Sequence, residues 1–219
     1  MARRERKANN NIFIRSKPKR ASYDKVLIVC EDTKSAKYYL ENFVADIGLS
    51  SANVKVVSGN GSAPINVVKT AIDSAEPIGE DIYDQIYCVI DRDHHESFDR
   101  AVDMLSRHSI KKSTKSKFFL IVSYPAFEIW ILYHKRYTSA SFGFSDDVIR
   151  EIKRHYLPNY DKASRGIYEM TRLDIETAIS NAKLSIVRAD NDGDKSPSTN
   201  MHDLIKQLRA ILNPEKVHS

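Results

Sequence analysis

The chain is poor in cysteine and has no long apolar stretch. Cys30 and Cys88 are the only two thiols among 219 residues, which excludes a disulfide framework and predicts two small core side chains. No apolar run approaches the roughly 20 residues that a membrane-spanning helix needs. The basic N-terminus is not followed by the apolar segment of a secretory signal. We therefore expect a cytoplasmic protein that does not cross the membrane.

The composition is ordinary for a globular protein, with a basic bias. Hydrophobic residues make up 42% and charged residues 29% of the chain, and the net charge is +5, which permits a polyanionic partner without establishing one. The basic residues crowd into residues 1–22, which lack any periodicity. We interpret this segment as a mobile tail that contacts phosphates or, alternatively, as a solvated leader. Its candidate nucleic-acid contacts are Arg15, Lys17, Lys19 and Arg20.

Apolar runs alternate with segments of helical periodicity over residues 23–143. This order predicts an α/β domain, with a parallel sheet, right-handed crossovers and helices on both faces. Residues 144–219 carry helical patterns and no strand signal, so we expect a helical extension packed on the same core. The strands are expected at 25–30, 53–57, 82–90 and 118–122, and the helices at 33–46, from 64 to about 76, and at 97–107, 126–134, 145–156, 163–187 and 198–212.

Two of the predicted strands end in acidic residues. The first is followed by Glu31 and the third by Asp91 and Asp93, and neighbouring strands of such a sheet border a ligand crevice at their carboxyl ends. Asp91 and Asp93, two residues apart, should point the same way. Converging carboxylates favour Mg²⁺ or Mn²⁺. The alternative is that both aspartates are turn residues and that Glu31 complements the dipole of the first helix.

Basic residues flank these acids. Lys34 and Lys37 lie at the start of the first helix, where either can contact a phosphate, although Lys37 fits a solvated face equally well. Arg92 lies between the two aspartates and is a further candidate for nucleic-acid binding. His94 and His95 orient water or phosphate, or are solvated loop residues. The basic loop 111–117 lies at the opposite end of the sheet and is a poor candidate.

The acidic strand ends resemble the Toprim domain of topoisomerases, primases and nucleases, through Leu27–Lys37 and Asp91-Arg92-Asp93. A closer resemblance, covering most of the chain, is to the RloB/AbiLii family of bacterial phage-defence proteins. Two positions depart from that family's usual pattern, since Tyr124 replaces an asparagine and Asp32 replaces a glycine. The segments that carry this second resemblance are 30–31, 38–39, 83–93, 123–134, 178–182 and 197–202.

The resemblance implies a Toprim-type, Mg²⁺-dependent nuclease in an abortive-infection or restriction-linked system, with an ATPase encoded beside it. In this interpretation Glu31, Asp91 and Asp93 hold the metal, and Glu31 serves alternatively as the general base. Lys34 offsets charge on the phosphorus. Glu128, just past the fourth strand, is a fourth metal ligand or only an acid favoured by a helix dipole.

Other functions fit the sequence less well or remain open. A Toprim-shaped subunit that binds nucleic acid or an ATPase and cuts nothing is the main alternative. Phospho-acceptor receiver domains and haloacid-dehalogenase-like phosphatases need their acid pair after the first strand, whereas here the pair follows the third. The sequence leaves open whether the substrate is DNA or RNA, possibly tRNA, and whether the protein is a homo-oligomer.

Overall fold

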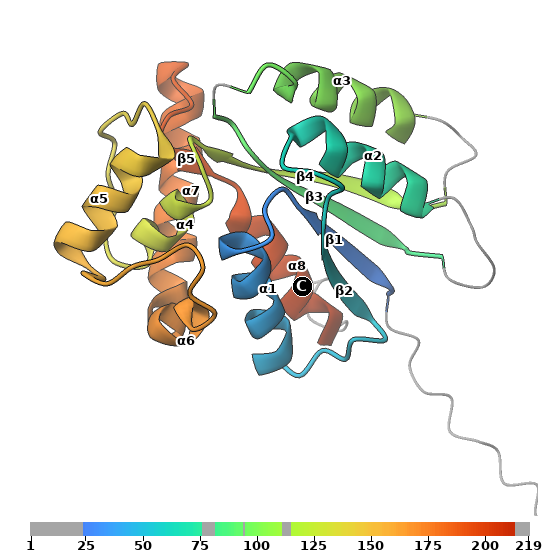
Figure 1. The fold of residues 1–219 in the computed structure, drawn as a ribbon, viewed down its shortest axis with the longest axis horizontal. Helices are drawn as coiled ribbons and strands as arrows, with labels where there is room; N and C mark the ends of the chain where they lie inside the picture. Colours follow the sequence, from blue (N-terminus) through green and yellow to red (C-terminus); the bar gives the residue numbers. More distant parts are fainter. Residues whose placement is uncertain (1–23, 76–81, 94, 111–114, 213–219) are drawn as a thin grey trace, which may run out of the picture.

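The computed structural model describes residues 24–75, 82–93, 95–110 and 115–212 (Figure 1). The expectations for the basic tail, with Arg15, Lys17, Lys19 and Arg20, lie outside these residues, as do His94 and the first part of the basic loop.

The first part of the chain alternates strands with helices, as predicted. The apolar, β-branched runs become strands because both of their faces are covered; in β1 all five residues are buried. The element ends differ from the predicted ones by at most three residues, which is the usual uncertainty of element ends. The elements are β1 (Val26–Cys30), α1 (Ser35–Asp46), β2 (Val54–Ser58), α2 (Pro64–Ala75), β3 (Gln85–Asp91), α3 (Phe98–Ser109), β4 (Lys117–Tyr124) and α4 (Glu128–Tyr133).

The sheet has the order β2-β1-β3-β4-β5, so β1 and β3 are neighbours at its centre. The first four strands are parallel, with Cys30 level with Val89 and Asp91 level with Ser123. The backbone N–H of Glu31 continues the ladder by donating to the carbonyl of Val89 at 3.0 Å. This order confirms the prediction that the carboxyl ends of the first and third strands lie side by side.

The expectation that the extension contains no strand is wrong. Ser198–Thr199 forms β5, which pairs antiparallel with the end of β4. The side chain of Asn200 fixes this pairing, because it accepts from the Val122 amide at 2.7 Å and donates to the Leu120 carbonyl at 3.0 Å. A strand of two residues is too short to show an alternating pattern, so sequence periodicity could not reveal it.

The helices of the extension are α5 (Ser145–His155), α6 (Ile167–Thr171), α7 (Ile175–Asp192) and α8 (Met201–Leu212). The single helix expected at 163–187 is therefore divided, with the 3₁₀ turn Arg172–Asp174 between α6 and α7. Gly193 ends α7 in the left-handed conformation, with φ of 73°, which glycine adopts without strain.

Helices cover both faces of the sheet (Figure 1). On one face, α2 and α3 pack on a core that includes Val29 and Ile90. On the other face, α1 and α4 share a single core with the helices of the extension, represented by Trp130, Ile152 and Leu204. The extension is thus built into the larger core. Among the described residues, none of the helices has both the length and the apolar character needed to span a bilayer.

His134 is buried in that larger core, and we expect it to stay neutral well below neutral pH. Burial lowers its pKa to about 4. The Tyr39 hydroxyl lies 3.0 Å from Nε2, and Nδ1 lies 2.9 Å from the Trp130 carbonyl, so the partners fit a proton on Nδ1 and the tyrosine as donor to Nε2. Since unfolded histidine titrates near 6.5, the unfolded chain takes up a proton first as pH falls. This residue's contribution to stability is complete above about pH 6.5 and is lost towards pH 4, a change of about 3 kcal/mol.

An NMR titration of the His134 Cε1 proton tests this prediction. We expect no titration of the folded protein between pH 8 and pH 5.5. Tyr39→Phe removes the hydroxyl that donates to Nε2 and should move the titration to higher pH. A midpoint near 6.5 in the folded wild-type protein would contradict the assignment.

Candidate functional site

The carboxyl ends of β1 and β3, together with the start of α4, carry a group of acids that we call the acid rim: Glu31, Asp32, Asp91, Asp93 and Glu128. Glu31 follows β1, and its Oε2 accepts a hydrogen bond from the backbone N–H of Asp91, the last residue of β3, at 3.0 Å. This bond joins two strand ends that are 60 residues apart in the chain. The pairing of β1 with β3 is therefore what brings Glu31 and Asp91 together.

The acids of the rim act on one another electrostatically. Burial, together with the negative charges of Glu128, Glu31 and Asp32, raises the pKa of Asp91 well above its ordinary value, and the charge of Lys162 opposes this rise. Burial also raises the pKa of Glu31 to about 7. The hydrogen bond from the Asp91 amide lowers it, and the charges of Asp93 and Asp32 raise it further. Burial is the largest cause of both shifts, and the neighbouring carboxylates add to it.

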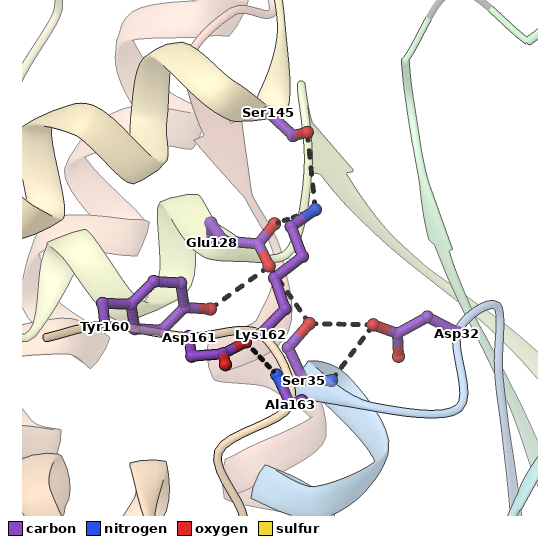
Figure 2. A network of polar contacts seen from close by, with 8 residues as sticks. All are labelled: Asp32, Ser35, Glu128, Ser145, Tyr160, Asp161, Lys162 and Ala163. Atoms are coloured by element: carbon purple, nitrogen blue, oxygen red, sulfur yellow. Dashed lines mark hydrogen bonds and ion pairs between the residues drawn. The ribbon is translucent and has the colours of Figure 1, made fainter.

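Glu128 is held in a buried polar network (Figure 2). Its side chain is 1% exposed. Oε1 accepts from the Ser35 hydroxyl at 3.1 Å and from the Tyr160 hydroxyl at 3.2 Å, while Oε2 lies 3.5 Å from Nζ of Lys162. Favourable interaction with a helix dipole therefore does not describe Glu128 fully, because the carboxylate links α4 to α1 and to the loop before α6.

Asp32 is joined to the same network through Ser35. Its Oδ2 accepts from the Ser35 amide at 3.1 Å and from the Ser35 hydroxyl at 2.8 Å, which provides a partner for the first backbone amide of α1. Its Oδ1 is buried and has no hydrogen-bond partner within the described part of the chain. A buried carboxylate oxygen without a donor is costly, so this atom is suited to a ligand that the protein itself does not provide.

Asp93 has the turn role that the alternative interpretation gave it. Its Oδ1 accepts from the backbone N–H of His95 at 2.9 Å, and the side chain is exposed. His95 continues the turn, since its Nδ1 accepts from the Ser97 amide at 3.2 Å before α3 begins. The charge of Asp93 nevertheless acts on Glu31, so the turn also adds negative charge to the acid rim.

The basic residues predicted from the sequence differ in their exposure, in their partners and in the face of the sheet on which they lie. Lys34 is exposed at the start of α1. Lys37 is engaged along its own helix by an ion pair with Glu41. Arg92 turns to the opposite face of the sheet, where its guanidinium lies 4.6 Å from the centre of the Phe98 ring.

Lys162 is a cation of the acid rim that sequence reasoning missed. It lies between α5 and α6, pairs with Glu128, opposes the pKa rise of Asp91 and lies 3.4 Å from the Ser145 hydroxyl. Tyr160 and Ser35 were missed as well. Tyr160 lies in a loop without any motif, Ser35 lies inside the segment Leu27–Lys37 but was given no role, and only tertiary packing brings both to Glu128.

The acids match Mg²⁺ or Mn²⁺ in chemistry and form no ready-made cage. In residues 24–75, 82–93, 95–110 and 115–212, no group of three or more His, Cys, Asp or Glu side chains is arranged to hold a metal ion. Mg²⁺, however, is commonly held by one or two carboxylates and several waters. The all-carboxylate donor set, the raised pKa of Asp91 and the unpartnered Oδ1 of Asp32 all favour a hard cation at this position.

Comparison with known proteins identifies the family. A family model described as RloB-like protein matches residues 26–208, which extend from β1 into α8 and include the whole acid rim. Searches of curated proteins and of solved structures found no match.

The network around Glu128 predicts a specific pattern of stabilities. Lys162→Met leaves a buried carboxylate without its cation, and because the lysine head is partly solvated we expect a loss of about 2 kcal/mol in the free energy of unfolding, less than for a fully buried pair. Adding Glu128→Gln removes the unpaired charge and should recover at least half of that loss. Urea unfolding at pH 7.5 measures both values.

Lys153→Met, which removes an exposed lysine from α5, is the matched control and should change stability by less than about 0.5 kcal/mol. If Lys162→Met behaves like this control, Lys162 does not neutralise Glu128.

Proposed function

The chain belongs to the RloB-like protein family, and from that premise we propose that it is a metal-dependent nuclease, the effector of a bacterial anti-phage system. The reaction is hydrolysis of a phosphodiester bond in nucleic acid, in the cytoplasm. The observation that carries this proposal is the hydrogen bond between Glu31 Oε2 and the Asp91 amide, which joins two acidic residues at the carboxyl ends of neighbouring parallel strands. Ligands of open α/β sheets bind at that position.

In this proposal Glu31 is the general base. The Asp91 amide occupies Oε2, so Oε1 is the oxygen that accepts a proton from the attacking water. Burial in an acidic surrounding raises its pKa to about 7, in the range that suits proton transfer near neutral pH. The hydrogen bond from the Asp91 N–H also fixes the position of the Glu31 carboxylate, and therefore the position of the proton acceptor.

Asp91 would hold Mg²⁺ or Mn²⁺, with Asp93 and Glu128 as further ligands, and Glu31 would join them only in the alternative in which it is not the base. The ion would supply the positive charge that polarises a phosphate oxygen. Lys162 offsets the remaining negative charge through its pair with Glu128. Lys34, exposed at the start of α1, contacts the substrate phosphate, as does Lys37 when its pair with Glu41 opens. The neighbouring ATPase that the resemblance implies is proposed as the partner that controls cleavage.

One observation favours a second candidate function. The absence of a ready three-ligand group in the described residues fits a Toprim-shaped subunit that binds nucleic acid or the ATPase and cuts nothing. Such a protein would bind nucleic acid with the salt dependence of phosphate contacts and release no product.

Asp91→Asn tests the nuclease proposal. We expect cleavage to fall at least about 100-fold, because a ligand of the metal and a neighbour of the base is lost, while the fold is kept. Plasmid, single-stranded DNA and total tRNA are incubated with Mg²⁺ and then with Mn²⁺, with and without the ATPase. Asp73→Asn, an exposed aspartate of α2, is the matched control and should cleave like the wild type.

Full activity of a folded Asp91→Asn protein would refute this assignment of the site. Binding without cleavage under every condition would favour the second candidate.

Thermal unfolding tests the metal separately from catalysis. At 10 mM Mg²⁺ and an affinity near 1 mM, mass action stabilises the wild type by about 1.4 kcal/mol, which raises Tm by roughly 3 °C. Asp91→Asn should lose this response. Without metal the variant should melt above the wild type, because it lacks a carboxylate whose pKa is raised by burial and by neighbouring acids. Sodium chloride at equal ionic strength is the control, and an equal Mg²⁺ response in both proteins would place the ion elsewhere.

A further inference from the structure

A pocket of about 700 Å³ lies on the other face of the sheet, beside the end of β4. It forms because α2 and α3 cover this face only in part. Alternate residues of β4 face it, and Leu120, Val122 and Tyr124 are each only half-buried. Together with Val102 of α3, they give the pocket an apolar floor.

Two aromatic rings stand at the end of the pocket nearest the strand ends. Phe98 and Tyr124 pack edge to face with their centres 6.3 Å apart. The Phe98 side chain is buried, whereas that of Tyr124 is half-exposed. Tyr124 is therefore the ring against which a planar ligand can lie.

A cationic side chain lies over each of these rings. The Arg92 guanidinium lies 4.6 Å from the centre of Phe98, and Nζ of Lys195 lies 6.0 Å from the centre of Tyr124. Lys195 forms no ion pair with any residue that the structure describes. Arg92 forms an ion pair with the exposed Asp99 at 3.7 Å and donates a hydrogen bond to the Asp93 carbonyl at 2.9 Å. Asp99 and Asp103 line the α3 side of the pocket, so its positive end is the one formed by Arg92 and Lys195.

The pocket and the acid rim adjoin through two consecutive residues. Asp91 continues the alternation of Tyr87 and Val89, which belong to the core on the α1 side, while Arg92 turns to the α3 side and lines the pocket. Consecutive Cα atoms are about 3.8 Å apart. The two side chains point to opposite faces, so a strand bound at Arg92 has to pass round the end of β3 to bring its next phosphate to the carboxylates.

We propose that this pocket holds one unpaired nucleotide of a single-stranded nucleic acid. The base lies against Tyr124 and the apolar floor, and its phosphate lies between Arg92 and Lys195, which leads the adjoining phosphodiester to the acid rim. This inference rests on the proposed nuclease function and names its substrate class. A base paired in a duplex is stacked and cannot enter such a pocket without being extruded.

Binding without metal tests the proposal independently of cleavage. The full-length protein in EDTA is titrated against a fluorescein-labelled 12-nucleotide oligothymidylate and against a 12-base-pair duplex, with anisotropy as the readout. We expect the single strand to bind at least about 10-fold more tightly. Tyr124→Leu should weaken single-strand binding about 5- to 50-fold through lost stacking. Lys195→Ala should weaken it as well and reduce the salt slope by about 0.7, the contribution of one phosphate contact.

Lys55→Ala, an exposed lysine on β2 at the far edge of the sheet, is the matched control and should bind like the wild type. Thermal unfolding verifies that each variant folds. Lys195→Ala keeps the test decisive if Tyr124→Leu does not fold, because Lys195 is exposed and its removal leaves no cavity in the core.

The outcomes separate this inference from the nuclease proposal. Equal binding of duplex and single strand, or unchanged binding by a folded Lys195→Ala protein, would each overturn the nucleotide pocket. Full displacement of the oligonucleotide by equimolar thymidine monophosphate would overturn a nucleic-acid strand as its occupant. If Asp91→Asn abolishes cleavage while the pocket variants bind normally, the nuclease proposal stands and the pocket fails. If no protein cleaves but the pocket variants lose binding, the pocket stands as a binding site alone.

Discussion

The parallel pairing of β1 with β3 is the constraint on which the rest of this protein depends. It places Glu31 beside Asp91, and the hydrogen bond from the Asp91 amide to Glu31 holds one carboxylate against the backbone that carries the other. The ladder fixes the backbone positions of the two acids, and the Glu31 side chain can turn away only by breaking its hydrogen bond to the Asp91 amide. The sheet thus maintains a concentration of negative charge that loops alone would relax by turning their side chains into water.

The surroundings of Asp91 show how the fold tolerates this charge. Glu128 is nearly fully buried, and its partners come from two other segments of the chain, the start of α1 with Ser35 and the loop before α6 with Tyr160 and Lys162. The helical extension therefore supplies the cation of the acid rim as well as part of the core. The pKa of Asp91 is still raised well above its ordinary value, so the compensation is incomplete. A site that keeps uncompensated charge is less stable than it could be, and a divalent cation would relieve that cost.

The end of β3 separates the acid rim from the pocket beside α3, because neighbouring side chains of a strand lie on different faces. Successive side chains of a strand point to opposite faces of the sheet, so Asp91 belongs to the acidic side and Arg92 to the pocket beside α3. The D-R-D sequence thus provides acid on one face and a cation on the other. In the proposed function, the acidic face carries the chemistry and the pocket selects unpaired nucleic acid.

The sequence alone determined the alternation of strands and helices, the strand order at the centre of the sheet and the meeting of Glu31 with Asp91, because buried parallel strands have a clear apolar signature and their topology follows fixed rules. It also identified the family, which the match over residues 26–208 confirms. Only the tertiary structure revealed β5, the network of Lys162 and Tyr160 around Glu128, and the turn of Arg92 away from the acids. These features depend on contacts between distant segments or on a strand of two residues, and neither leaves a periodic signal in the local sequence.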